Sequence, residues 1–255
     1  MATQSRQPIA HGIAHGAILL TRPLPQSVRF AAALTQRFGA ALHIVISPLI
    51  APVFFAGPVP NRPFTALILT SETGVVAAQR IMAQGATLPR RAYCVGHHTA
   101  RCAADAGLDA VSAAGDATAL VALIGAQNLS GPLLHICGRD MRGEVAARLI
   151  SAGIETLEQV AYAQDPVELT AEAVAHLTGR GRVAVPLFSP RTATLLVAEC
   201  ARIGLTAPLS VIAMSRDVAE AAAPLPAKTR ATALAPTGEA MLTAIAALLY
   251  PAPGS

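Results

Sequence analysis

The sequence contains no tryptophan and a single lysine, Lys228, and this scarcity excludes several enzyme classes. A phosphate-binding loop ending in Gly-Lys-Ser/Thr cannot form, because Lys228 lies among proline, alanine and threonine. A Schiff-base enzyme would depend on the same lysine, which has no supporting acid nearby. The net charge of +4 is therefore carried almost wholly by arginine.

Cysteine is also scarce, and its spacing argues against both disulfides and metal. Cys94, Cys102, Cys137 and Cys200 form no Cys-x-x-Cys pair and have no histidine at ligand spacing. We therefore expect buried thiols and no metal site. Reduced thiols, together with the lack of a basic and apolar leader, favour a cytoplasmic protein.

Long uninterrupted apolar runs are missing as well. Residues 42–60 contain four prolines, so no membrane-spanning helix is expected. Aromatic residues make up only 4% and the arginines are scattered, which argues against a nucleic-acid partner. With 53% hydrophobic and 13% charged residues the chain is globular, and its arginines suit a small anionic ligand.

What the sequence does contain is an internal repeat. Short apolar runs with similar turns recur at offsets of 117 or 118 residues, pairing Arg22 with Arg139, Ser71 with Ser189, and Gly96 with Met214. Each run is followed by a stretch with helical periodicity, and Asp116 and Thr237 are placed to cap the last helix of each half.

Strands that alternate with helices predict an α/β fold with two doubly wound parallel sheets of four or five strands each. Proline follows an extended run at Ser47-Pro48 and at Asp165-Pro166, which indicates a pair of linkers. In such sheets ligands bind outside the carboxyl ends of the strands, where the turns after each apolar run fall. We expect two such edges, facing each other, to form a cleft.

No GxGxxG follows a predicted strand and no Gly-x-Ser-x-Gly is present. However, the ordered segments LLTRP, ILTSETGV, YCVGHHTA, HICGRDMRGEVAARLISAGI, VAYAQDP and LFSPRTA resemble the uroporphyrinogen-III synthase family over about residues 17–250. The resemblance implies a cofactor-free enzyme that cyclises hydroxymethylbilane, a linear tetrapyrrole with eight carboxylates, and inverts its last pyrrole ring.

The same resemblance implies two α/β domains joined by a two-stranded β connector. One domain would combine residues 1–47 with 167–255, the other would hold 52–164, and 48–51 and 165–166 would be linkers. A monomer is the expected state, and a hand-over of substrate from hydroxymethylbilane synthase is left open.

The resemblance also implies site residues. Tyr162 matches a tyrosine favoured as the catalytic group in the family. The implied substrate-binding positions are Thr21, Arg22, Thr70, Ser71, Thr73, Gly96, Thr99, Gly138, Arg139, Arg142 and Ser189. The sequence departs from the family pattern at residues 214–217, where Met-Ser-Arg-Asp replaces a glycine turn, and the role of Arg191 stays open.

Each candidate has a structural alternative. Ser71 and Ser189 precede helices and would serve as N-caps alone. Arg22 and Arg139 would only cover sheet ends or pair with acids, and Tyr162 would be an ordinary strand tyrosine. His97 and His98 have no carboxylate neighbour in the sequence and are expected to be exposed turn residues, and His11 and His15 to lie in a disordered leader.

Another function class remains open at this stage. Two α/β lobes with two crossings also describe a hinged binding or regulatory module for a small anionic ligand. A transferase of doubly wound type is a third reading, since the fold does not fix the function.

Overall fold

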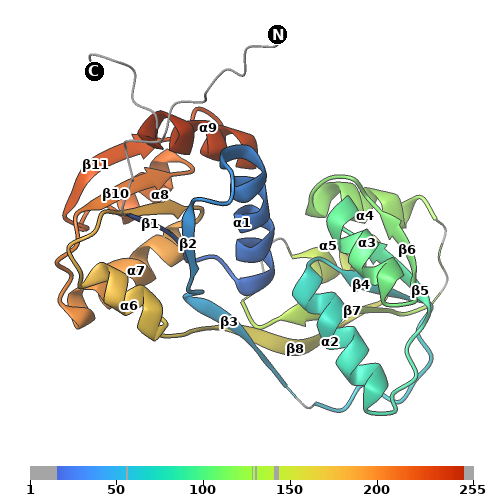
Figure 1. Cartoon of the computed structure of the whole chain (residues 1–255). Coiled ribbons are helices and arrows are strands. Elements are labelled where there is room, and N and C mark those ends of the chain that lie inside the picture. The colour runs from blue at the N-terminus through green and yellow to red at the C-terminus, as the bar shows by residue number, and fades with distance from the viewer. Residues whose placement is uncertain (1–15, 56, 128, 130, 141–143, 250–255) are drawn as a thin grey trace, which may run out of the picture. The chain divides into compact units, whose positions relative to one another are not determined.

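The computed structural model describes residues 16–55, 57–127, 129, 131–140 and 144–249. The chain divides into two compact units, of which unit 1 comprises residues 1–51 and 166–255 and unit 2 comprises residues 52–165. Each unit is an α/β structure, with its strands and helices labelled in Figure 1.

Unit 1 has a five-stranded sheet in the order β11-β10-β9-β1-β2. Its elements are β1 (Ala17–Leu20), α1 (Leu24–Phe38), β2 (His43–Ile46), α6 (Ala171–Leu177), β9 (Val183–Leu187), α7 (Pro190–Ile203), β10 (Leu209–Ala213), α8 (Arg216–Ala221), β11 (Ala227–Thr232) and α9 (Gly238–Leu249). Every pair of neighbouring strands is parallel.

Both faces of this sheet are covered. Along β1, Ala17 and Leu19 pack into a core with residues of α6, α7 and α8. The alternate residues Ile18 and Leu20 pack with α1 and α9 on the other face. The unbroken apolar run that defined β1 in the sequence is therefore that of a strand buried on both sides.

Unit 2 has a six-stranded sheet in the order β3-β8-β7-β4-β5-β6. Its elements are β3 (Ile50–Phe54), β4 (Ala66–Leu69), α2 (Glu72–Ala83), β5 (Arg91–Cys94), α3 (His97–Asp105), β6 (Asp109–Ser112), α4 (Ala117–Gly125), β7 (Leu133–Gly138), α5 (Val145–Ser151) and β8 (Thr156–Pro166). Helices α2 and α3 cover one face and α4 and α5 the other.

The segments that repeat in the sequence form strands at equivalent positions in the two sheets. Strands β8, β7, β4, β5 and β6 of unit 2 stand in the same order as β2, β1, β9, β10 and β11 of unit 1. The predicted fold class is thus confirmed. The expected helix caps are also present, since Asp116 accepts hydrogen bonds from the Thr118 and Ala119 amides and Thr237 from the Ala240 amide.

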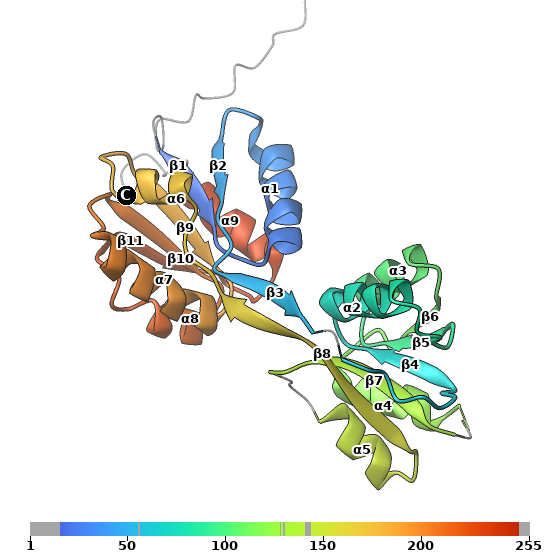
Figure 2. The same ribbon diagram turned by 90° about the horizontal axis from the view of Figure 1, so that it is seen from below.

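The prediction of four or five strands per sheet is wrong for unit 2, because β3 joins the edge of its sheet. The Phe55 amide donates to Ala161 O at 2.9 Å and the Val167 amide to Leu49 O at 3.1 Å. The paired residue numbers run in opposite directions, so β3 and β8 are antiparallel, as Figure 2 shows. One boundary between the units falls within β3 and the other within β8. Residues 50, 51, 165 and 166, which were expected in linkers, are therefore part of these two strands.

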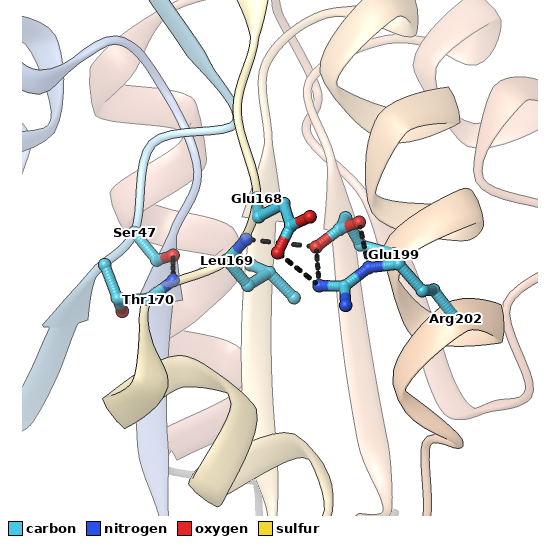
Figure 3. Close-up of polar contacts among 6 residues, drawn as sticks. All are labelled: Ser47, Glu168, Leu169, Thr170, Glu199 and Arg202. Carbon is cyan, nitrogen blue, oxygen red and sulfur yellow. Dashed lines mark hydrogen bonds and ion pairs between the residues drawn. The ribbon is translucent and has the colours of Figure 1, made fainter.

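The chain that follows β8 is fixed to unit 1 by the polar network in Figure 3. The Leu169 amide donates to Glu199 Oε2 at 3.0 Å, and Arg202 binds both oxygens of Glu199 at 2.8 Å. The Thr170 amide donates to Oγ of the buried Ser47 at 2.9 Å. These contacts set the start of α6, which Thr170 caps through its side chain.

No helix within the described part of the chain combines the length and the apolar character that crossing a bilayer requires.

Candidate functional site

The residues predicted for the site fall into two groups, one in each unit. In unit 2, Thr70, Ser71 and Thr73 follow β4, and Gly96 and Thr99 follow β5. Gly138 ends β7, Arg139 follows it, and Tyr162 lies in β8. In unit 1, Thr21 and Arg22 follow β1, and Ser189 follows β9. Arg142 lies outside the described residues.

Both groups lie where ligands bind in open α/β sheets. In unit 2 the chain leaves β4 toward β5, whereas β7 stands on the other side of β4. The crossovers diverge at this point, and in open α/β sheets this is where ligands bind, at the carboxyl ends of the two strands. Ser71 and Gly138 stand at those two ends.

The centre of the unit 2 group is a pair of hydroxyls. Tyr162 Oη and Ser71 Oγ are 2.8 Å apart. Ser71 Oγ also accepts a hydrogen bond from the Gly74 amide at 3.0 Å and thereby caps α2, as its position before a helix predicted. Ser71 Oγ keeps a second lone pair and its own proton, so either hydroxyl can donate in this pair. When Ser71 donates, the phenol proton is available to a ligand.

A bulge in β8 aims Tyr162 at this point. Cys137 of β7 is opposite Val160, but the next residue, Gly138, is opposite Tyr162. The extra residue, Ala161, reverses the side-chain alternation, so that Ala161 and Tyr162 both pack in the core beneath α2 and α3. Bulges of this kind commonly redirect a side chain at a functional site.

Electrostatics keep Tyr162 protonated. The side chain is buried, and burial raises the pKa of its phenol above the ordinary value of 10, while the hydrogen bond to Ser71 acts in the opposite direction. At neutral pH the group is therefore a phenol that can donate a hydrogen bond, and it is not a phenolate base.

Residues after the bulge extend the same polar edge. Gln164 Nε2 donates to Thr73 Oγ1 in the first turn of α2 at 3.2 Å. The Arg139 amide donates to Tyr162 O at 2.8 Å, and its exposed guanidinium pairs with Asp165 at 2.7 Å. Of these, sequence analysis named Thr73 and Arg139 but missed Gln164 and Asp165, although both lie in the VAYAQDP segment that carried the resemblance.

A shallow pocket on unit 2 borders this region between β3, β8 and α2. Its lining includes Phe54, Arg80 and Ala161. The Arg80 guanidinium lies 4.2 Å from the centre of the Phe54 ring, and that ring is 6.3 Å from the ring of Tyr162. Sequence analysis gave no signal for Arg80.

The α3 end of unit 2 requires one correction. Thr99 is buried in the first turn of α3, and Gly96 is its N-cap. His97 and His98 are exposed as expected, but they lie in the first turn of α3 and not in a loop, and His98 Nε2 is 3.2 Å from Glu72 Oε2. Residues 26 positions apart meet here because α2 and α3 pack on the same face of the sheet.

In unit 1, Arg22 covers an aromatic ring. Its guanidinium lies 4.0 Å from the centre of the Phe188 ring, which in turn packs edge-on against Phe30. Partial burial lowers the pKa of Arg22, and the positive charge of Arg29 adds to the effect. Both arginines line a pocket beside α1, so positive charge is held at this edge of unit 1.

The other two predicted residues of unit 1 have structural roles. Thr21 is buried and its carbonyl accepts from the Leu49 amide at 3.1 Å. Ser189 caps α7 by accepting from the Thr192 amide at 3.2 Å, and its hydroxyl lies 2.8 Å from Thr192 Oγ1. The predicted N-caps at Ser189 and Ser71 are thus present.

Two groups of three side chains within the described residues are able to hold a metal ion, namely His43, Glu172 and His176 in unit 1 and Glu72, His98 and Cys102 in unit 2. The statement that no histidine stands at ligand spacing from a cysteine is corrected, since His98 precedes Cys102 by one helical turn and its Nε2 lies 3.7 Å from the thiol. Cys94, Cys137 and Cys200 are buried as predicted, whereas Cys102 is half-buried.

Comparison with known proteins decides the family. The model of the family described as uroporphyrinogen-III synthase HemD matches residues 29–243. The chain belongs to this family. It is accordingly an enzyme of tetrapyrrole biosynthesis with uroporphyrinogen-III synthase activity. Comparison with curated protein sequences gave no match.

Solved structures of two uroporphyrinogen-III synthases are similar to the chain. A uroporphyrinogen-III synthetase from Helicobacter pylori has 16% identity and a TM-score of 0.60, with 91% of this chain and 99% of that chain covered. A mutant uroporphyrinogen III synthase from the thermophilic bacterium Thermus thermophilus has 17% identity and a TM-score of 0.47, with 91% and 98% covered. The first likeness shows a shared α/β fold.

Proposed function

We propose that the carboxyl edge of β4 and β7 in unit 2 is where this chain converts hydroxymethylbilane to uroporphyrinogen III, with Tyr162 as the catalytic group. The supporting observation is the pair formed by Tyr162 Oη and Ser71 Oγ, 2.8 Å apart at the topological switch point of the sheet. A protonated phenol held at this place suits a reaction that begins with the departure of hydroxide.

The reaction requires a proton for its leaving group. Electrons from the pyrrole nitrogen expel the hydroxymethyl oxygen, and a proton donated by Tyr162 lets that oxygen leave as water. The substituted carbon of the terminal ring attacks the resulting azafulvene to form a spiro intermediate. That intermediate fragments and recloses, so the ring is inverted and the phenol proton is restored by loss of a ring proton.

Ser71 has a positioning role in this proposal. Its hydroxyl accepts from the Gly74 amide and lies 2.8 Å from Tyr162 Oη. Either hydroxyl can donate in this pair, and when Ser71 donates, the phenol proton is free to reach the leaving group. General-acid assistance of this kind contributes about 10²-fold at the lower end of its usual range. The larger contribution comes from folding the substrate so that the substituted carbon is nearer than the unsubstituted one.

The substrate's carboxylates need positive groups, and each unit has them without lysine. Arg139 stands beside Tyr162 at the carboxyl edge of unit 2, and the N-terminus of α2 adds its backbone dipole. In unit 1, Arg22 and Arg29 line one pocket. We propose Arg22, Arg139 and Arg142 as carboxylate-binding residues, together with the hydroxyls and glycine turns named from the sequence.

We further propose that the enzyme acts as a cytoplasmic monomer. Cys94, Cys102, Cys137 and Cys200 are free thiols, as is usual in a reducing compartment. Size-exclusion chromatography with light scattering measures the mass, and 26.1 kDa is expected for the monomer. A direct hand-over of substrate is tested by adding unlabelled hydroxymethylbilane to a coupled assay that makes labelled hydroxymethylbilane. With hand-over, the unlabelled compound should dilute the label in the product less than free mixing of the two pools predicts.

The test of the function is a coupled assay. Purified chain is added to hydroxymethylbilane synthase and its substrate in buffer with a chelator, and the oxidised products are resolved by chromatography. We expect the type III isomer without added metal or nucleotide. Type I product with and without the chain would refute the proposal and favour a binding module for a small anion.

A further inference from the structure

Three metal-capable side chains meet on unit 1, at the end of the sheet opposite to Arg22 and Ser189. His43 is the first residue of β2, whereas Glu172 and His176 lie one turn apart on α6. His43 Nε2 is 3.5 Å from Glu172 Oε1, and the rings of His43 and His176 have their centres 4.7 Å apart. One donor atom from each residue lies within 4.8 Å of the others.

The backbone holds these residues in register. Thr170, at the start of α6, binds Ser47 beyond the end of β2, while His176 in the last turn meets His43 at the start of β2. Helix and strand therefore run in opposite directions side by side. The network of Glu199 and Arg202 in Figure 3 fixes the chain just before α6, so its position is set without any ion.

A simpler explanation accounts for part of this group. Glu172 lies in the first turn of α6 and His176 in the last, where the helix dipole favours a negative and a positive side chain respectively. The contact between His43 and Glu172 is exposed, and an exposed pair of this kind contributes at most about 1 kcal/mol even when the imidazole is charged. Neither effect explains why His43 and His176 lie side by side. If both imidazoles were protonated, their positive charges would repel each other.

Two neutral imidazoles and one carboxylate form a familiar ligand set for a divalent transition metal. With bonds of about 2.0–2.1 Å, tetrahedral ligand atoms stand roughly 3.3 Å apart. The separation of 3.5 Å between His43 and Glu172 already approaches this value, and the ligand atom of His176 lies within 4.8 Å of both. Imidazole ligands select zinc, cobalt or nickel over magnesium or calcium.

We propose that His43, Glu172 and His176 form a binding site for one divalent metal ion of the zinc class, with water in the fourth position. The ion would join α6 to the edge strand β2 and stabilise unit 1. None of the three residues belongs to the proposed catalytic edge, so this site is separate from the synthase reaction.

Calorimetric titration of metal-stripped full-length chain with zinc chloride tests the site. The variant His11→Ala/His15→Ala/His98→Ala serves as background, because it removes other histidines that would bind zinc. We expect one equivalent to bind with micromolar affinity at pH 7.5. Binding should weaken at least tenfold at pH 5.5, since the imidazoles must be neutral.

In that background His43→Ala, His176→Ala and Glu172→Gln should each weaken binding at least tenfold, while His97→Ala serves as the matched control. Saturating zinc should raise the melting temperature of the background chain by about 5 °C and leave that of His43→Ala unchanged. Circular dichroism shows whether His176→Ala folds, and His43→Ala gives a second reading from another element. Equal affinity in all variants, or no binding by the background chain, would overturn the proposal.

Discussion

The ring of Tyr162 lies directly against the backbone of Gly138, so close that no side chain fits at residue 138. A Cβ built on Gly138 would lie 2.7 Å from Cε2 and 3.0 Å from Cζ of Tyr162. The two residues are partners across β7 and β8 at the bulge. Glycine at the end of β7 thus allows the phenol to reach Ser71.

The first prediction concerns this contact. Gly138→Ala should displace the Tyr162 ring, because a contact of 2.7 Å forces one of the two residues to move. We expect kcat to fall at least tenfold, with an unfolding free energy lower by about 1–3 kcal/mol. Gly125→Ala is the matched control, since a Cβ there meets nothing within 4 Å. Equal activity of both variants would show that the Tyr162 position is unimportant.

The second prediction separates acid catalysis from substrate folding. Tyr162→Phe removes one oxygen and should lower kcat by about 10- to 100-fold, or roughly 1.4–2.7 kcal/mol of barrier, with little change in KM. The remaining product should be type III, because folding of the substrate selects the carbon attacked. Rate and isomer ratio are measured together. A wild-type rate would remove the acid role, and a slow enzyme that makes type I would mean that Tyr162 positions the substrate.

The third prediction distinguishes the two roles of Ser71. Ser71→Ala removes the cap of α2 and should cost about 1 kcal/mol of stability. It should also lower kcat several-fold, because the Tyr162 phenol loses the hydroxyl 2.8 Å away. Asp116→Ala removes the cap of α4 and is the control, with a similar loss of stability and unchanged kcat. If the two variants behave alike in both measurements, Ser71 is only a cap.

The fourth prediction uses two arginines that form similar exposed ion pairs at opposite ends of unit 2. Arg139 pairs with Asp165 at the carboxyl edge, and Arg62 pairs with Glu155 at the amino edge. Arg139→Ala should raise KM by about tenfold, because a charge-assisted hydrogen bond to a carboxylate contributes about 1.5–3 kcal/mol. Arg62→Ala should leave KM unchanged. Neither should alter stability by more than about 1 kcal/mol.

The fifth prediction concerns pH and His135, which is buried in β7 with its ring nitrogens out of hydrogen-bond reach of the described residues. Burial lowers the pKa of His135 from 6.5 to about 4. Between pH 6.5 and pH 4, His135 therefore binds a proton in the unfolded chain but not in the folded chain. The free energy of unfolding consequently falls as the pH drops toward 4. The loss is at most on the order of 3 kcal/mol.

Urea unfolding of the wild type and His135→Leu at pH 7.5 and pH 5 checks this sign. The difference in unfolding free energy between the two pH values should be smaller in the variant. An identical pH dependence in both proteins would mean that Glu158, 3.7 Å from His135 Nδ1, compensates for the charge.

The family and the fold class were predictable because they depend on local patterns. Apolar runs followed by helical periodicity define the parallel sheets, and Ser71, Ser189 and Asp116 were recognisable as caps from their positions before helices. Both signals are contained within a few residues of sequence, as is the segment around Tyr162 that carried the resemblance.

The bulge was not predictable from the sequence, and the edge strand was expected only as part of the two-stranded connector that the resemblance implied. The extra residue in β8 is Ala161, and an alanine gives no signal of a bulge in the sequence. The side-chain direction reverses only because of how β8 pairs with β7. Residues 50–54 contain a proline, and that they extend the sheet of unit 2 to six strands is decided by the free edge of β8.

By itself, the sequence determined the repeated βα units, the helix caps and the family, since each depends on residues close together in the chain. The tertiary structure alone decided that Tyr162 meets Ser71, that Gln164 reaches Thr73, and that His43 meets Glu172 and His176. These partners are 91 or more positions apart, and His176 is 133 positions from His43. Strand order and register bring such residues together, and neither is written in any short segment of the chain.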